Sequence, residues 1–240
     1  MKRGLCALVL VALAGCAGNA WPQPTPPSAK PGVALVGDSL LFQAAPYVAG
    51  ALAWYAVDAP LTNRTAGGVG LLDDGFHERL APILDDLPEG SVVVYQYSGN
   101  CFFGPGGGCP HVPGTAAFID AWAASMRLTI TAARERGLQP LWVISPRFGP
   151  AVGGHAETVV SIRNATLAVA EEMDVAVVDW GGALHDVYGG YQQLLWYADV
   201  FAEPAWHAVR DPDGVHLAPD GARRAASWTA YAVARLTAAP

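Results

Sequence analysis

Residues 33–41 read VALVGDSLL, and this stretch decides how the rest of the chain is interpreted. The unbroken apolar run over 33–36 predicts a buried strand. Gly37, Asp38 and Ser39 follow it directly, and residues of these types are common in turns. Two hypotheses follow: Ser39 is an ordinary turn residue, or it is a nucleophile placed at the end of a strand.

Outward from this stretch, apolar strand-like runs alternate with segments of helical spacing. The expected strands are 33–37, 54–58, 91–99, 141–145 and 175–180. The expected helices are 71–87, 115–137, 154–173 and a C-terminal helix that Pro219 opens. Nearly continuous apolar strands separated by helices indicate an α/β fold with a parallel sheet covered on both faces.

The composition is that of a folded domain with a large core. The chain has 240 residues, of which 52% are hydrophobic and 15% charged, so one α/β domain over 33–240 is expected. The formal net charge is −7 and no Lys/Arg-rich run is present, which argues against a nucleic-acid partner.

The first 32 residues have the pattern of an export and anchoring segment. Two basic residues and a short apolar run precede Leu13-Ala14-Gly15-Cys16, a tetrapeptide that resembles a bacterial lipobox. This resemblance implies a signal peptide over 1–15, lipidation of Cys16, a Pro-rich linker over 16–32 and a place on the membrane of the bacterial cell envelope. An ordinary secretory signal or a retained anchor is the alternative.

Cysteine usage fits an exported protein. With Cys6 removed and Cys16 lipidated, Cys101 and Cys109 are left, eight residues apart around a Gly-rich segment. A disulfide between them is expected in an oxidising compartment. No metal site is expected, because the chain has no CxxC or HExxH pattern.

Polar residues, or glycines that leave the backbone accessible, follow three of the expected strands. Ser39 comes after the first, Gly67 and Gly68 after the second, and Asn100 after the third. The carboxyl ends of parallel strands form the edge at which such sheets bind ligands. The sequence therefore predicts a site at that edge.

The blocks GDSL (37–40), NRTAGGVG (63–70), Gly99-Asn100 and DGVH (213–216) resemble, in order, those of the SGNH, or GDSL, hydrolases. The resemblance spans residue 33 to the end. It implies a flavodoxin-like three-layer α/β/α sandwich with a mainly parallel five-stranded sheet, and no cofactor. It also implies an oxyanion hole formed by Ser39, Gly68 and Asn100. Gly67 and Gly70 are alternatives to Gly68.

The chemistry of a serine hydrolase needs a base beside the hydroxyl. A serine is a poor nucleophile until a neighbouring group accepts its proton, and the imidazole of His216 suits that role. Asp213, three residues earlier, is expected to orient the ring, with Asp211 as the second choice. Asp38 is expected to hold the loop through backbone hydrogen bonds.

One position departs from the family pattern. The block that usually reads G-x-N-D has Cys101 in place of the final acid. A disulfide from Cys101 to Cys109 is expected to pin the loop that follows Asn100. The aromatic segment 188–206 is expected to be core and substrate rim.

Together these features predict an extracytoplasmic serine esterase that forms an acyl-enzyme on Ser39. Its expected substrate is a small-molecule or glycan ester, including short-chain or O-acyl esters of envelope glycans or lipids. An O-acyltransferase that uses the same triad, and a non-catalytic glycan-binding protein on the hydrolase fold, are the alternative functions.

Overall fold

The computed structural model describes residues 30–102, 109–184, 190–199 and 202–238. The predicted signal peptide, Cys16 and almost all of the linker lie outside these residues, as does the Gly-rich segment 103–108.

Five strands form one all-parallel sheet in the order β2-β1-β3-β4-β5. They are β1 (Val33–Gly37), β2 (Leu61–Asn63), β3 (Val92–Gln96), β4 (Gln139–Ile144) and β5 (Ala176–Asp179). This is the flavodoxin-like order, in which the direction of winding reverses between β1 and β3. The sequence prediction of a parallel five-stranded sheet is confirmed.

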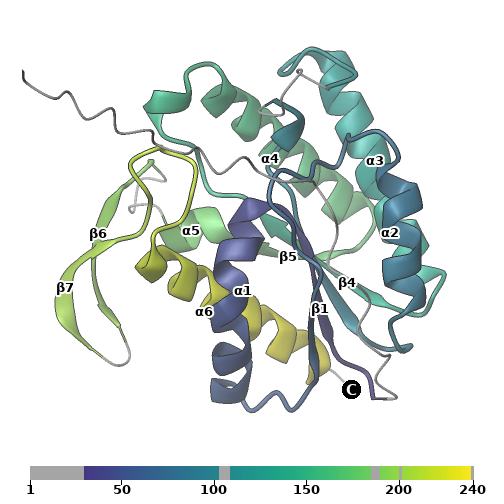
Figure 1. Ribbon diagram of the computed structural model, residues 1–240, viewed down its shortest axis with the longest axis horizontal. Helices are drawn as coiled ribbons and strands as arrows, with labels where there is room; N and C mark the ends of the chain where they lie inside the picture. The colour runs from purple at the N-terminus through teal and green to yellow at the C-terminus, as the bar shows by residue number, and fades with distance from the viewer. Residues whose placement is uncertain (1–29, 103–108, 185–189, 200–201, 239–240) are drawn as a thin grey trace, which may run out of the picture.

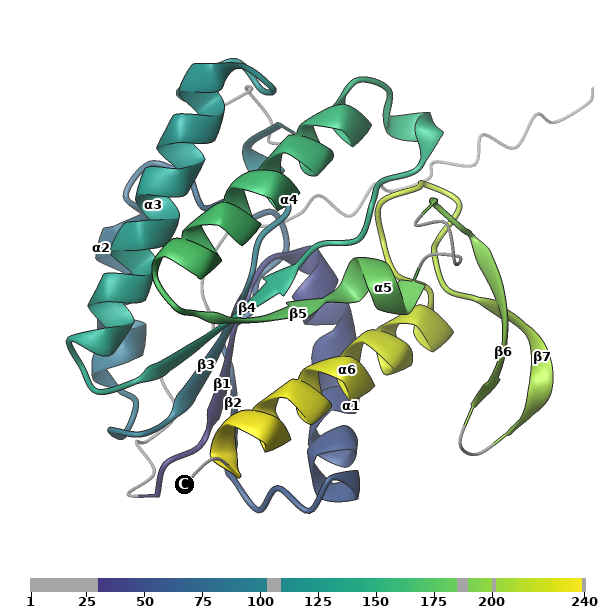
Figure 2. The ribbon, with the colours of Figure 1, turned by 180° about the vertical axis from the view of Figure 1, so that it is seen from behind.

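Helices cover both faces of the sheet and make a three-layer sandwich, as Figures 1 and 2 show. The helices are α1 (Ser39–Trp54), α2 (Phe76–Asp85), α3 (Ala116–Arg134), α4 (His155–Glu172), α5 (Trp180–Leu184) and α6 (Pro219–Thr237), with short 3₁₀ turns at Asn100–Phe102 and Pro150–Val152. Alternate strand residues point to opposite faces. Leu35 and Val94 pack with α1, α5 and α6, whereas Val36 and Tyr95 pack with α2, α3 and α4.

The prediction of a strand at 54–58 is wrong. The apolar run after Ser39 is a helix, α1, which continues to Trp54 and buries Leu40, Leu41 and Val48 against the sheet. Backbone bonds from Tyr55 to Ala51 and from Val57 to Leu52 close this helix, and the second strand begins only at Leu61. A β-branched and aromatic pentapeptide at a helix end carries the same local signal as a strand, and the longer helix overrides it.

Two predicted elements are shorter than expected. The predicted helix 71–87 begins at Phe76, because Asp73 accepts the N–H of Gly70 and Gly75 has φ +64°, so the chain turns before the helix. The predicted strand 91–99 leaves the sheet after Gln96. The helices predicted over 115–137, 154–173 and from Pro219 are confirmed within a few residues.

A two-stranded antiparallel hairpin, β6 (Leu194–Asp199) with β7 (Ala202–Ala208), stands outside the sandwich beside α6 (Figure 2). Its inner face is attached by Tyr197, whose ring lies 4.5 Å from the Arg224 guanidinium, and by His207, which hydrogen-bonds Asp220 at 3.1 Å. Its outer face carries Trp196 and Trp206, which are 58% and 66% exposed. The prediction that this segment is core is wrong for the described residues, none of which is buried.

Candidate active site

Ser39 is the first residue of α1, and a single residue, Asp38, separates it from the carboxyl end of β1. The chain passes very close to β3 at this point: a Cβ on Gly37 would lie 2.4 Å from the carbonyl oxygen of Gln96. The N–H of Asp38 donates to the same carbonyl at 3.0 Å. Glycine at position 37 therefore lets β1 deliver Ser39 at the switch point between β1 and β3.

Asp38 is fully buried and organises the start of α1. Its carboxylate accepts the N–H of Leu40 at 2.9 Å, and also the N–H and hydroxyl of Ser98 at 2.7 and 2.5 Å. Burial raises the pKa of Asp38 to about 6, although these hydrogen bonds lower it. The prediction that Asp38 supports the loop is confirmed.

The N–H of Leu41, the next one along the first turn of α1, is also bound by a buried side chain. Gln96 accepts the N–H of Leu41 through Oε1 and donates through Nε2 to the hydroxyl of Ser145. Because Leu40 and Leu41 are engaged, the N–H of Ser39 is the donor left at the positive end of this helix, next to its own hydroxyl.

Asp213 and His216 form a closed hydrogen-bonded turn before α6. Asp213 Oδ2 lies 2.6 Å from His216 Nδ1, and Asp213 Oδ1 accepts the N–H groups of Val215 and His216 at 2.8 and 2.9 Å. Gly214 has φ +77°, which this tight turn requires. Burial raises the pKa of Asp213, but the bonds from His216 and Val215 outweigh it, so the pKa lies below its usual value.

The turn brings the imidazole to Ser39. His216 Nε2 lies 3.1 Å from Ser39 Oγ, although the two residues are 177 positions apart. Hydroxyl, imidazole and carboxylate thus form one continuous chain of hydrogen bonds, the arrangement that activates a serine nucleophile.

Asp211, the second choice for the acid, has a different place. Its backbone N–H donates to the carbonyl of His216 at 2.9 Å. Among the described residues, the carboxylate that contacts the His216 ring is that of Asp213.

The two remaining sequence-predicted residues lie on adjoining loops. Asn100 is 7% exposed and donates one amide N–H to the carbonyl of Val69 at 3.1 Å, which leaves its second N–H for a ligand. Gly68 precedes Val69 and has φ +79°. Gly70 is excluded as a donor, because its N–H is bound to Asp73 at 2.7 Å. Gly68 and Gly67 remain.

Cys101 and Cys109 form the predicted disulfide, with an S–S distance of 2.03 Å. Cys101 is the residue after Asn100 and is 5% exposed, so the bond ties the Asn100 loop to residue 109.

The sequence analysis did not identify Arg210 as a residue of the site. Its guanidinium, on a residue 1% exposed, donates to the carbonyls of Arg147, Gly214, Val215 and His216. Nothing local distinguishes this arginine from the others, because its partners are backbone atoms that only the folded loop brings together.

No described helix is both long and apolar enough to cross a bilayer. No three His, Cys, Asp or Glu side chains of the described ranges are grouped so that they could hold a metal ion.

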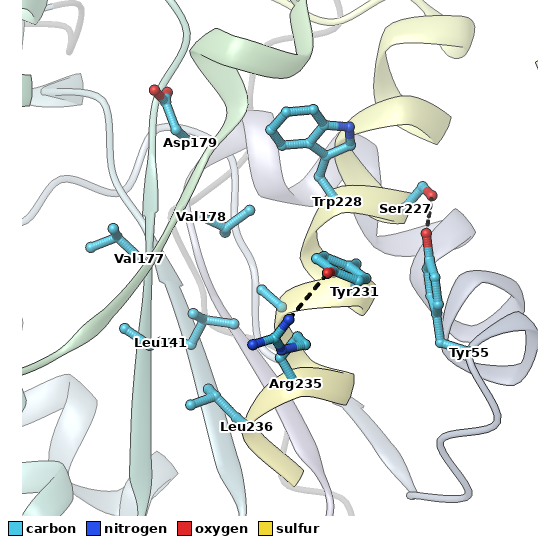
Figure 3. Close-up of a pocket in the computed structure, with 12 residues that line it drawn as sticks. Tyr55, Leu141, Val177, Val178, Asp179, Ser227, Trp228, Tyr231, Arg235 and Leu236 are labelled. Atoms are coloured by element: carbon cyan, nitrogen blue, oxygen red, sulfur yellow. Dashed lines mark hydrogen bonds between the residues drawn. The ribbon is translucent and has the colours of Figure 1, made fainter. Parts of the chain in front are cut away.

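A hollow of about 680 Å³ lies between β5 and α6, lined by Val177, Trp228 and Tyr231 among others (Figure 3). A second hollow, of about 530 Å³, lies between α1, α6 and the hairpin. None of the candidate catalytic residues lines either one.

The fold is shared with solved esterase and lipase structures. The chain is similar to a lipase/acylhydrolase from Enterococcus faecalis, with a TM-score of 0.61 and 13% identity over 86% of this chain and 97% of that one. It is similar to an acetyl xylan esterase from Geobacillus stearothermophilus, with a TM-score of 0.62 and 14% identity over 87% and 97%. A GDSL-like lipase from Bacteroides thetaiotaomicron gives a TM-score of 0.61 and 12% identity over 89% and 93%.

No protein-family model and no curated protein matches the chain. At these identities the structures show that the chain has the fold of GDSL/SGNH hydrolases.

Proposed function

We propose that this protein is a serine hydrolase of carboxylic esters. The observation that carries the proposal is the chain of contacts from Asp213 Oδ2 to His216 Nδ1, at 2.6 Å, and from His216 Nε2 to Ser39 Oγ, at 3.1 Å. The fold it shares with solved acylhydrolases and acetyl xylan esterases supports the same reaction class.

In the first half of the reaction, Ser39 Oγ attacks the ester carbonyl carbon while His216 Nε2 takes the hydroxyl proton. The tetrahedral intermediate then collapses, and His216 gives that proton to the departing alcohol. An acyl group remains on Ser39. In the second half, His216 takes a proton from water, the hydroxide attacks the acyl carbon, and the proton returns to Ser39 as the acid leaves. Asp213 holds the ring orientation throughout.

The negative charge that develops on the carbonyl oxygen needs donors aimed at it. The donors proposed for this role are the N–H of Ser39 at the start of α1 and the second amide N–H of Asn100, with the N–H of Gly68 or Gly67 as the third. The positive end of the α1 dipole adds to the stabilisation.

The substrate proposed is an O-acyl or short-chain ester, including acyl groups on glycans. The side chains of His216 and Asp213 are 38% and 48% exposed, so the site is close to the surface and suits an ester carried on a larger molecule. The acetyl xylan esterases that share the fold act on esters of this kind, as their names state.

The location proposed is the bacterial cell envelope, through a lipid on Cys16. The lipobox-like LAGC sequence supports it, and so does the Cys101–Cys109 disulfide, because such bonds persist in oxidising compartments. Labelling with a lipid precursor should mark the protein, and Cys16→Ala should abolish the label; a labelled variant contradicts the anchor.

A fluorophosphonate probe, which reacts with activated serines, tests the catalytic proposal. The wild-type protein should be labelled and should hydrolyse aryl esters, whereas Ser39→Ala and His216→Ala should lose both by at least about 10³-fold. Ser161→Ala, which changes a serine on the outer side of α4, is the matched control and should behave as wild type.

Two outcomes overturn the proposal. A folded wild-type protein that is neither labelled nor active on a broad ester panel favours the glycan-binding alternative. Acyl transfer to an added glycan that outruns hydrolysis favours the acyltransferase.

A further inference from the structure

Arg210 lies inside the loop that carries the proposed acid and base. The loop of residues 210–217, called the base loop below, is closed at its ends by a β-bridge between Arg210 and Leu217. The N–H of Asp211 also donates to the carbonyl of His216 at 2.9 Å. Arg210, at one end of this closure, is 1% exposed.

The guanidinium bonds three carbonyl oxygens of the base loop. It donates to Gly214 at 3.2 Å, to Val215 at 2.6 Å and to His216 at 3.3 Å. These are consecutive residues, and the last is the proposed base itself. The planar fork of donors on an arginine matches several acceptors in fixed directions at once.

The same side chain also binds the segment that follows β4. It donates to the carbonyl of Arg147, in the segment that follows the carboxyl end of β4, at 2.8 Å. The N–H of Gly149 in that segment donates to Gly214 at 2.8 Å. The backbone that carries His216 is therefore fixed to the segment after β4, and β4 belongs to the same sheet as β1, the strand that leads to Ser39.

The charge of Arg210 is stabilised by the carbonyl dipoles that it binds and, from a greater distance, by the carboxylates of Asp213 and Asp211. No carboxylate oxygen of the described residues lies within 4 Å of its nitrogens, and its guanidinium lies 5.4 Å from the ring centre of Tyr191. Burial lowers the pKa of Arg210 to about 10, so the group keeps its charge at neutral pH. A buried charge with several acceptors is expensive to displace, which makes the arrangement rigid.

We propose that Arg210 is a positioning residue for the esterase reaction, which holds His216 Nε2 at bonding distance from Ser39 by fixing the backbone of the base loop to the segment after β4. The proposal rests on the proposed function, because it assigns Arg210 a role in that reaction. In this role Arg210 does not contact the substrate and acts only through the backbone of the base loop.

The test compares Arg210→Met and Arg210→Lys with the wild-type full-length chain. Assays are run at least 20 °C below each melting midpoint, so that unfolded protein does not contribute. In Arg210→Met, kcat and the rate of fluorophosphonate labelling of Ser39 should fall together by about 10²-fold, while KM changes little, because small displacements of catalytic groups have effects of this size. Arg210→Lys should restore part of the rate, because it keeps one charge and a donor.

Arg163→Met is the matched control. Arg163 is partly buried and bound to Asp179 by two bonds of 2.6 Å, on α4 and away from the base loop. It should lose stability with kcat within about twofold of wild type.

Three outcomes are informative. A folded Arg210→Met protein with wild-type kcat at a lowered melting midpoint makes Arg210 a purely structural residue and overturns the inference. Where Arg210→Met does not fold, the inference stands or falls on Arg210→Lys, which overturns it by having full kcat. A wild-type chain that is itself unlabelled and inert removes the proposed function, and this inference with it.

Discussion

Two loops meet at the candidate site, and they are held by buried charges of opposite sign. The nucleophile loop, residues 37–41, surrounds the carboxylate of Asp38, which accepts N–H groups of Leu40 and Ser98. The base loop surrounds the guanidinium of Arg210, which donates to carbonyls of residues 214–216.

The difference follows from the backbone. A helix start presents unpaired N–H groups, so a buried acceptor stabilises it; a tight turn folded onto itself presents carbonyls, so a buried donor does. In both loops the charged residue lies beside the reacting group and does not itself react. Each half of the site thus contains one buried charge that binds its backbone.

The largest effect expected on the base loop is that of Asp213→Asn. The amide cannot hold the imidazole in the required tautomer, so kcat should fall by about 10³ to 10⁴-fold with the fold intact. Ester turnover measured at saturating substrate checks this. Asp211→Asn is the control, and an equal loss in that variant would contradict the assignment of Asp213.

Asn100 belongs to neither of these loops. Replacing it tests whether the loop that follows β3 also contributes to catalysis. Asn100→Ala removes a proposed oxyanion donor and should lower kcat by about 10² to 10³-fold. Asn164→Ala, which alters an exposed amide on α4, should leave the rate unchanged. A rate within twofold of wild type for Asn100→Ala would show that the amide only bonds Val69.

Asp38 on the nucleophile loop should give the protein a distinctive dependence of stability on pH. Burial raises its pKa from 3.8 to about 6, so between these values the folded state binds more protons than the unfolded state. Its contribution to the free energy of unfolding is therefore largest below pH 4 and decreases by about 3 kcal/mol as the pH rises through 6.

Asp38→Asn removes that dependence. Urea unfolding of both proteins at pH 4 and pH 7 measures it: the wild type should lose more stability over this interval than the variant. Asp120→Asn, on the exposed side of α3, is the control with the same chemical change. Equal losses in wild type and Asp38→Asn would mean that Asp38 does not titrate in this range.

The smallest effect is expected from the disulfide. Reduction of Cys101–Cys109 loosens the loop after Asn100 and leaves the nucleophile loop and the base loop unchanged. We therefore expect kcat to fall by about tenfold, with only a small change in the melting midpoint. A Cys101→Ser/Cys109→Ser double variant should match the reduced protein and be insensitive to reductant. Unchanged activity after confirmed reduction would show that the bond does not position Asn100.

Much of the fold was predictable because buried parallel strands carry an unbroken apolar signal. The strands that begin at Val33, Val92 and Gln139 and the helix from Pro219 lie where the pattern placed them, within a few residues. The strand predicted at 54–58 failed because its pentapeptide is equally compatible with a helix end. The prediction that the segment containing Trp196 is core was wrong, because its apolar composition was interpreted as burial whereas the outer face of the hairpin is exposed.

In the candidate site, the sequence pointed to Ser39, Asn100, Asp213 and His216 because their types and order are local features of the chain. It left Gly67 and Gly70 beside Gly68, and the structure removes Gly70 through its bond to Asp73. Gln96 and Arg210 were not predictable. Gln96 bonds the start of a helix 55 residues away, and Arg210 bonds backbone carbonyls that any sequence provides.

The amino-acid pattern alone indicates which residue types follow the strands, because strand periodicity and side-chain chemistry are both properties of short segments. It indicated a serine, a histidine and two candidate carboxylates. The folded chain is needed to show that His216 Nε2 lies 3.1 Å from Ser39 Oγ and that the carboxylate in contact with the His216 ring is that of Asp213. This distance depends on β1, β3 and β4 lying side by side in the sheet. It also depends on two buried charges, because Asp38 bonds Ser98 and Arg210 bonds Arg147, and these partners are distant in the chain and are brought together only by folding.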